Sequence, residues 1–302
     1  MRQNNIFLML LKVFFFSSIL VATSAVRAEL KVVTTIKPLH SLIANVMDGV
    51  GEPALIIEGS TSPHSFTLKP SHAKLLEEAD IIFWVGESIE TFMERPLESI
   101  VKNAEVVEFM EVESINKLKF REESIFEDHD DHDDHDDHDD HDDHDDHAGH
   151  EGHNHGEFDA HIWLDPSNAK EMVHEIAHEL GDLDPANKDK YEANAEATII
   201  ALDQLIKDVS KDINKDAKFV VFHDAYQYFE ERFGVRAAGA LTLNTDVLPG
   251  AKQVADIQDV IKDKGINCIF SEPQFNPKII STIAEDTNIK TGVFDPLGAN
   301  IN

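Results

Sequence analysis

NKDKYEANAEATIIALDQLIKDVSKDIN, residues 187–214, contains no glycine or proline and is dominated by residues that favour helix. Just before this stretch, Asp184 and Pro185 offer an N-cap and a first-turn proline. A single helix over about 185–214 would extend roughly 40 Å, because each helical residue rises about 1.5 Å. We therefore expect one long, rigid helix that joins the parts of the chain on either side of it.

Short apolar runs alternate with helical patterns on both sides of this helix, as in parallel sheets built from βαβ units. The sequence therefore predicts an α/β fold with two lobes of mostly parallel sheet flanked by helices. We place the N-terminal lobe at 29–165, a helical linker at 166–215 and the C-terminal lobe at 216–302. The expected strands lie within residues 29–38, 53–59, 80–86, 104–110, 218–224, 236–241, 266–273 and 288–298.

The first 28 residues have the features of a secretory signal peptide, with Arg2 and Lys12 ahead of an apolar stretch and small residues leading to Ala28. The apolar stretch is shorter than the roughly 20 residues of a membrane-spanning helix, and no later stretch approaches that length. Because no cysteine lies near Ala28, we expect an exported, soluble chain without a lipid or membrane anchor. The net charge of −32 disfavours nucleic acid and anionic membranes and suits a protein that handles cations.

The run DHDDHDDHDDHDDHDDHDDH occupies residues 128–147 and has no apolar residue. Such a segment cannot bury apolar surface to offset the entropy of ordering, so we expect a disordered loop over 122–158. Its imidazoles can bind divalent metals in many weak arrangements, and the alternative is a charged spacer with incidental metal affinity. The histidines of this run, which we treat as accessory low-affinity ligands, are His129, His132, His135, His138, His141, His144, His147, His150, His153 and His155.

Two of the remaining histidines lie near the ends of predicted strands, and a third begins an apolar stretch that leads into a helix. His223 ends the apolar run KFVVFH, His64 lies in GSTSPHSF after the strand PALII, and His161 begins HIWLDP. Asp295 follows the run KTGVF in the way that His223 follows its own strand. Ligands of open α/β sheets bind at the carboxyl ends of the strands, so these four side chains are candidates for one metal site in the cleft between the lobes.

HEIAH, residues 174–178, fits the pattern of zinc peptidases, in which two histidines one helical turn apart bind zinc and Glu175 acts as the general base. The same segment also fits an ordinary amphipathic helix with His174 and His178 on its exposed side. We favour that second interpretation, because a five-residue pattern arises easily in a helix rich in Glu and His. A third hypothesis is a metal buffer that works through the run at 128–155 alone.

Several motifs resemble the periplasmic metal-binding proteins of zinc ABC transporters, the ZnuA type of the cluster A-I solute-binding proteins. These motifs are EGSTSPHSFTLKPSHAKLLEEADIIFWVGESIETFMERPL, HIWLDP, FHDAYQYF, SEPQFNP and FDPLGANI, and the similarity covers essentially the whole mature chain. The resemblance implies two α/β lobes joined by one long helix, and a monomer that captures a divalent metal without catalysing a reaction. Its implied partners are a membrane permease and, through it, an ATPase.

Carried onto this sequence, the family's metal ligands fall on His64, His161 and His223, with Asp295 or a water at the last position. Some zinc members use a Glu just before the first histidine, but Pro63 occupies that place here. Three neutral imidazoles and one oxygen suit tetrahedral Zn²⁺, whereas Mn²⁺ favours more carboxylate ligands. Zinc is therefore the expected cargo, and Mn²⁺ or another divalent metal is the alternative.

One departure from the family concerns the end of the chain. Family members usually continue into a further C-terminal helix, and zinc members often carry a cysteine there that pairs with the one matching Cys268. This sequence ends at Asn302 and contains one cysteine. We therefore expect a shortened second lobe that keeps its binding residues but lacks a disulfide, which typically contributes about 2–4 kcal/mol.

Overall fold

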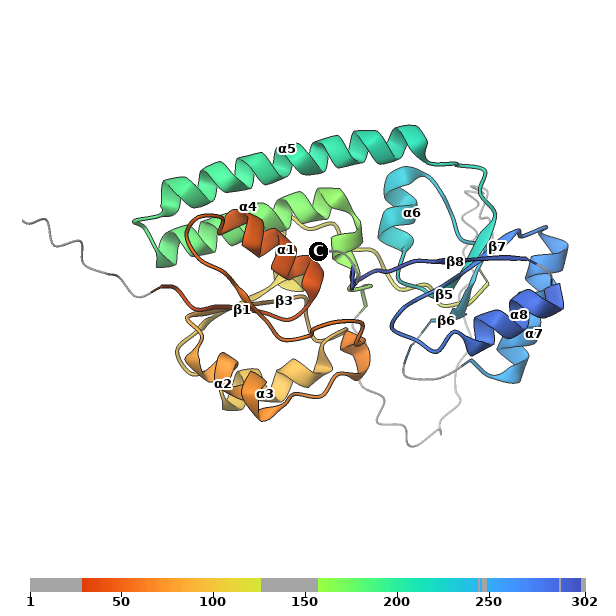
Figure 1. The fold of residues 1–302 in the computed structure, drawn as a ribbon, viewed down its shortest axis with the longest axis horizontal. Helices are drawn as coiled ribbons and strands as arrows, with labels where there is room; N and C mark the ends of the chain where they lie inside the picture. Colours follow the sequence, from red (N-terminus) through yellow and green to blue (C-terminus); the bar gives the residue numbers. More distant parts are fainter. Residues whose placement is uncertain (1–28, 126–156, 244, 246–248, 288, 300–302) are drawn as a thin grey trace, which may run out of the picture.

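Two parallel sheets form the centre of the molecule in the computed structural model, which describes residues 29–125, 157–243, 245, 249–287 and 289–299 (Figure 1). The first has the strand order β2-β1-β3-β4 and the second β6-β5-β7-β8. Each sheet with its covering helices is called here the first or the second lobe. The strands are β1 Val32–Thr34, β2 Ala54–Leu55, β3 Ile81–Trp84, β4 Glu105–Glu108, β5 Phe219–His223, β6 Ala240–Thr242, β7 Cys268–Ser271 and β8 Lys290–Val293.

These strands confirm the α/β fold class and the eight strands expected from the sequence. The helices alternate with them, as the βαβ pattern predicts. The helices are α1 Lys37–Val46, α2 Pro70–Glu78, α3 Glu94–Ser99, α4 Pro166–Leu183, α5 Lys188–Asp212, α6 Gln227–Phe233, α7 Ala251–Asp263 and α8 Lys278–Thr287. The expected signal peptide and most of the His/Asp loop fall outside the described residues, and the predicted domain boundaries stay predictions.

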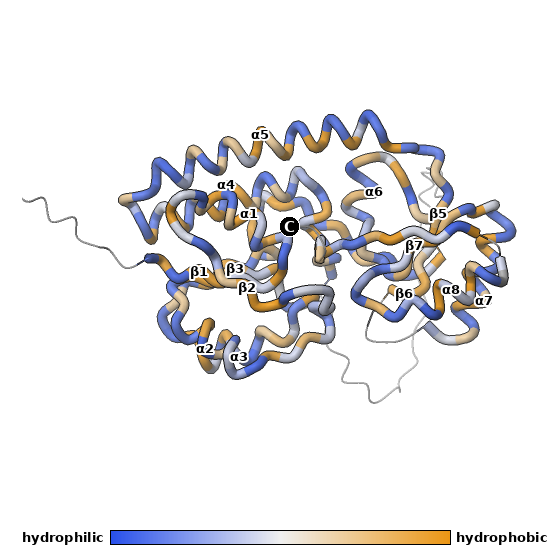
Figure 2. Tube along the Cα trace, viewed as in Figure 1, coloured by the Kyte–Doolittle hydropathy of each residue, from blue (hydrophilic) through white to orange (hydrophobic). Residues whose placement is uncertain are grey.

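The interior strands explain why the sheets form where they do. All four residues of β3 and all five of β5 are buried, as expected for parallel strands covered by helices on both faces. Each apolar side chain buried there stabilises the fold by roughly 1.5–3 kcal/mol. Figure 2 shows the hydrophobic residues gathered along the strands, whereas hydrophilic residues predominate along α5. Because β5 ends at His223, its buried position fixes that side chain at the carboxyl edge of the second sheet.

The long helix α5 lies across the top of both lobes in Figure 1 and packs along α4 and α1. Its buried residues, Tyr191 and Ala195, both lie in its N-terminal half. The predicted start at Asp184 and Pro185 is wrong, because α5 begins at Lys188 after an Asn187 cap. Asp184 instead ends α4, and its Oδ2 accepts a hydrogen bond from Asn187 Nδ2 at 2.6 Å. The two residues therefore shape the turn between the helices.

A second segment also crosses between the lobes, which the sequence did not suggest. The backbone N–H of Leu118 donates to Tyr228 Oη of α6 at 2.9 Å. Farther along, Ile125 pairs antiparallel with Gly239, and Ala240 N donates to Ser124 O at 2.8 Å. Residues 118–125 thus run from the first lobe onto the edge of the second sheet, so the lobes are joined through this segment as well as through α5.

No helix in the described part of the chain combines the length and the apolar character needed to cross a membrane. The longest one, α5, carries charged residues throughout its length.

Glu90 lies fully buried after β3, and burial raises the pKa of its carboxyl to about 7. Its Oε2 accepts hydrogen bonds from Val85 N at 2.7 Å and Gly86 N at 3.2 Å, so the side chain closes the turn that follows β3. The folded chain therefore retains a proton that the unfolded chain releases near its ordinary pKa of 4.5. The stability contributed by this proton is complete below about pH 4.5 and is lost as the pH rises through 7.

We expect Glu90→Gln to flatten the decline of stability between pH 5 and pH 8. The amide keeps one acceptor oxygen for the turn but has no proton to lose. The pH-dependent loss of unfolding free energy that the variant avoids amounts to up to roughly 3 kcal/mol. Urea unfolding at the two pH values measures it, with the exposed Glu77→Gln as the matched control. An unchanged slope in Glu90→Gln would show that this carboxyl ionises normally.

Candidate metal site

Three imidazoles from distant parts of the sequence meet at the junction of the two lobes. His64 lies in the short 3-10 turn Pro63–Ser65 after β2, His161 precedes the 3-10 turn Ile162–Leu164, and His223 ends β5. One ring nitrogen from each lies within 4.8 Å of the others. His161 and His223 are buried. The structure thus brings together the three histidines that the sequence predicts.

One pair of ring nitrogens has the spacing of a tetrahedral metal centre. Two nitrogens that each lie about 2.0–2.1 Å from a zinc ion in tetrahedral geometry are about 3.3–3.4 Å apart. The Nε2 atoms of His161 and His223 are 3.3 Å apart. The ring of His64 completes the triangle, with its centroid 5.5 Å from that of His161 and 5.8 Å from that of His223.

Two buried carboxylates hold these rings from behind. Asp159 Oδ1 contacts His161 Nδ1 at 2.6 Å and accepts from the backbone N–H of His161 at 3.0 Å. Glu272 Oε1 contacts His223 Nδ1 at 2.8 Å. A carboxylate oxygen can only accept, so each Nδ1 donates to its carboxylate and Nε2 is the ring nitrogen left to bind a metal. This arrangement is typical of imidazoles that bind metals.

We expect Asp159→Asn to weaken zinc binding by about 10–100-fold, the usual effect of losing a partner of this kind. A neutral amide accepts more weakly from Nδ1–H, so the His161 ring becomes a poorer donor and is held less firmly. Competition with a chromophoric chelator measures the change. The exposed Asp48→Asn is the matched control, and wild-type affinity in Asp159→Asn would contradict this role.

A small cavity of about 10 Å³ lies at the three rings, with room for little more than one atom-sized occupant. Its wall combines both lobes, and Trp163 Nε1 donates to Pro296 O at 2.8 Å across the junction. A larger cavity of about 160 Å³ shares His64, His161 and Ile89 with it. The remaining residues of the small cavity are Ser62, Pro63, Ile89, Trp163, Glu272, Gln274, Phe275, Pro296 and Leu297.

Asp295, the fourth residue predicted from the sequence, is not one of this group. Its Oδ2 accepts from Ala299 N at 2.8 Å, and its Oδ1 accepts from Gln274 Nε2 at 2.9 Å. In the described part of the chain the cluster that could hold a metal consists of the three histidines. Whether Asp295 or a water completes the coordination stays a prediction.

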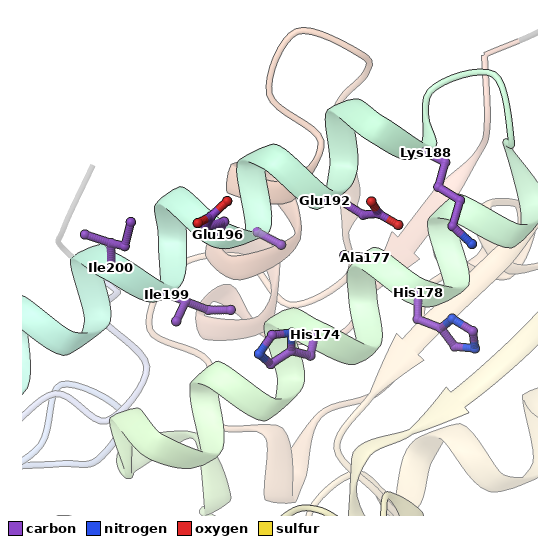
Figure 3. A pocket seen from close by; sticks show the side chains of 9 residues that line it. His174, Ala177, His178, Lys188, Glu192, Glu196, Ile199 and Ile200 are labelled. Carbon is purple, nitrogen blue, oxygen red and sulfur yellow. The ribbon is translucent and has the colours of Figure 1, made fainter.

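The HEIAH segment lies apart from this cluster. His174 and His178 line a groove of about 550 Å³ between α4 and α5, and Figure 3 shows their rings pointing away from each other along α4. His178 is exposed and lies 3.9 Å from Asp182. No third ligand joins the pair among the described residues. Their exposed positions agree with the interpretation of HEIAH as part of an ordinary amphipathic helix.

The ten histidines of the run at 128–155 lie outside the described residues, but both ends of the run can be placed. Ile125 bridges to Gly239 on the second lobe, and Phe158 bridges to Lys119. The chain therefore returns from the run directly into Asp159 and His161 at the cluster.

The two carboxylates behind the rings, Asp159 and Glu272, were not predicted from the sequence. Glu272 and His223 follow neighbouring strands, β7 and β5, which was the available signal. For Asp159 the only signal was its place two residues before His161.

The fold and the cluster together define a class: metal-binding proteins of the solute-binding type, with two α/β lobes around a buried set of imidazoles. A family model described as zinc-uptake complex component A periplasmic, or ZnuA, matches residues 32–302. The chain belongs to this family, as its motifs indicated.

Individual relatives agree with this assignment. The high-affinity zinc uptake system protein ZnuA of Brucella abortus (strain 2308) is 49% identical over 282 residues, which cover 89% of this chain and 84% of that protein. The protein of the same name from Yersinia pestis is 33% identical over 287 residues, with 94% and 88% covered. A crystal structure of ZnuA superposes with a TM-score of 0.70 at 22% identity, covering 90% of this chain and 93% of that one, and shares the fold.

Proposed function

We propose that this protein captures Zn²⁺ in the periplasm and delivers it to the permease of an ABC transporter for zinc uptake. The imidazoles of His64, His161 and His223 are the proposed ligands. The observation that carries the proposal is the 3.3 Å separation of two inward-facing Nε2 atoms, each with a carboxylate behind its Nδ1. The family and its zinc-uptake relatives support zinc as the cargo.

The donor set favours Zn²⁺ over Mn²⁺. Three imidazole nitrogens gathered within 4.8 Å of one another suit zinc, whereas Mn²⁺ prefers a larger set of oxygen ligands. The carboxylates nearest the rings, Asp159 and Glu272, face the Nδ1 side and so do not serve as oxygen ligands in this arrangement. Manganese remains the alternative cargo, and equilibrium dialysis against equal concentrations of both metals distinguishes them.

The His/Asp run acts as an accessory collector in this proposal. Each metal bound there has to order a segment without a core of its own, so its sites are weak, while the cluster binds one ion tightly. The described residues that follow the run lead into Asp159 and His161, which supports a role for the run in supplying metal to the tight site. We further propose that residues 1–28 direct export and that the mature chain works as a monomer.

Zinc uptake by cells that lack this chain tests the function directly. Wild-type chain supplied in trans is expected to restore uptake of radioactive zinc, whereas His161→Ala is not. Glu175→Gln is the discriminating control, because a peptidase built on HEIAH would need Glu175 as its base and a receptor would not. Uptake restored equally by His161→Ala would overturn the proposal.

A further inference from the structure

Gln274 is the one amide side chain among the residues that line the small cavity at the three imidazoles. It lies in the loop after β7, two residues beyond Glu272, which holds His223. Neither the motifs nor the chemistry considered so far assigns Gln274 a part in binding. Its amide can offer a neutral oxygen to an ion at the cluster.

The direction of this amide is fixed by Asp295. Gln274 Nε2 donates to Asp295 Oδ1 at 2.9 Å. Because a carboxylate oxygen can only accept, the NH₂ group must face Asp295 and the carbonyl oxygen must point the other way. That oxygen, Oε1, is buried and accepts no hydrogen bond from any residue that the structure describes. A buried acceptor without a partner destabilises the fold, and an ion bound at the cluster would supply that partner.

Asp295 itself is committed to the turn that follows β8. Besides Gln274, it accepts from Ala299 N at 2.8 Å and from Leu297 N at 3.3 Å. These bonds and the one from Gln274 hold the Asp295 carboxylate toward the turn. Gln274 lines the cavity and Asp295 does not.

Glu272 also has a buried oxygen, Oε2, without a hydrogen-bond partner in the described structure. Its other oxygen holds Nδ1 of His223, on the side of the ring opposite to the metal-facing Nε2. Glu272 therefore cannot reach an ion at Nε2 without releasing the imidazole that it positions.

We propose that Gln274 Oε1 supplies the oxygen at the fourth coordination position and that Asp295 is a positioning residue behind it; this rests on the proposed function of the three histidines. The site then follows one pattern: three neutral donors, on His161, His223 and Gln274, each oriented by a carboxylate that faces away from the ion. A neutral oxygen adds no carboxylate to the donor set, which keeps the site suited to zinc rather than manganese.

Four variants of the full mature chain test this inference, with at most one equivalent of metal so that the tightest site is measured. Zn²⁺ affinity comes from chelator competition, and the visible spectrum of bound Co²⁺ reports the ligand set. Gln274→Met, similar in length but without the oxygen, should weaken zinc binding by about 10–100-fold and change the Co²⁺ spectrum. Asp295→Ala should weaken it less and leave the spectrum four-coordinate. Gln274→Glu keeps an oxygen at the same reach, so it should retain the spectrum and bind Mn²⁺ more competitively.

The reverse order, with Asp295→Ala causing the larger loss and the altered spectrum while Gln274→Met behaves as wild type, would overturn the inference and make Asp295 the ligand. Wild-type affinity and spectrum in both variants would also overturn it, leaving water at the fourth position. His223→Ala separates these results from a failure of the proposed function. If His223→Ala keeps the tight site, the histidine cluster is not the tight zinc site. If His223→Ala loses the tight site, the proposed function stands, and the other variants decide only whether Gln274 is a ligand.

Discussion

His223→Ala is expected to weaken zinc binding by at least about 100-fold. Apparent binding energies of about 10–16 kcal/mol for four-ligand zinc sites correspond to roughly 3 kcal/mol for each ligand, and about 1.4 kcal/mol is tenfold in affinity. His223 is also the proposed imidazole ligand from the second lobe, so its loss leaves His64 and His161, both on the first lobe, as the two proposed nitrogen ligands. Chelator competition at pH 7.5 measures the change.

Two controls separate lost coordination from lost folding. His178→Ala removes an exposed imidazole outside the cluster and should bind zinc as the wild type does. Thermal unfolding of metal-free protein should show a folded His223→Ala chain, and added zinc should raise its melting temperature less than that of the wild type, because stabilisation by a ligand depends on its affinity. Equal stabilisation of both proteins by zinc would contradict the assignment of His223.

Arg121→Ala is expected to lower the free energy of unfolding by about 3–5 kcal/mol at pH 8, the range for removing one partner of a buried ion pair. The guanidinium of Arg121 bonds Asp224 Oδ1 at 2.8 Å and Glu230 Oε2 at 2.6 Å. Both carboxylates are buried, and burial raises the pKa of Asp224 to about 7 even with the arginine present. Arg121 therefore compensates two buried charges where residues 118–125 cross onto the second lobe.

The effect of Arg121→Ala should depend on pH. Without the guanidinium, the pKa values of Asp224 and Glu230 rise further, so the folded variant retains protons that its unfolded chain releases. Its stability then falls as the pH rises, and the deficit against wild type is larger at pH 8 than at pH 5. Urea unfolding at both pH values measures this, with the exposed Arg95→Ala expected to stay within about 0.5 kcal/mol. A deficit that is equal at the two pH values would mean that the carboxylates are not what Arg121 compensates.

Much of the fold was predictable because its signals are local. Strands such as IIFW and FVVFH consist mainly of apolar residues, and the position of His223 at the end of one of them was enough to place it at a sheet edge. His64 required the topological rule that loops after parallel strands meet at one edge, whereas the signal for His161 was an apolar stretch that leads into a helix. The start of α5 was missed because Asp184 and Pro185 have the composition of a cap, while the turn between α4 and α5 uses Asp184 to end the preceding helix.

The residues that orient the side chains of the metal site could not be predicted from the sequence in the same way. Glu272 lies 49 residues from His223, and their contact depends on the adjacency of β5 and β7. The amide of Gln274 acquires its direction only from Asp295, on a different strand. The crossing of residues 118–125 has no periodic pattern, because it is made of backbone hydrogen bonds and one arginine. Pairings of this kind depend on tertiary structure, whereas apolar runs and strand ends are recorded in the sequence itself.

The central claim is that the tight zinc site is the histidine cluster between the lobes and not the His/Asp run. A competitive zinc titration of the mature chain tests it most directly, comparing wild type, a deletion of residues 128–155, and His223→Ala. We expect the deletion to keep one tight site and lose only weak ones, while His223→Ala loses the tight site and keeps the weak ones. Loss of the tight site in the deletion, with its retention in His223→Ala, would contradict the account and make the run the functional element.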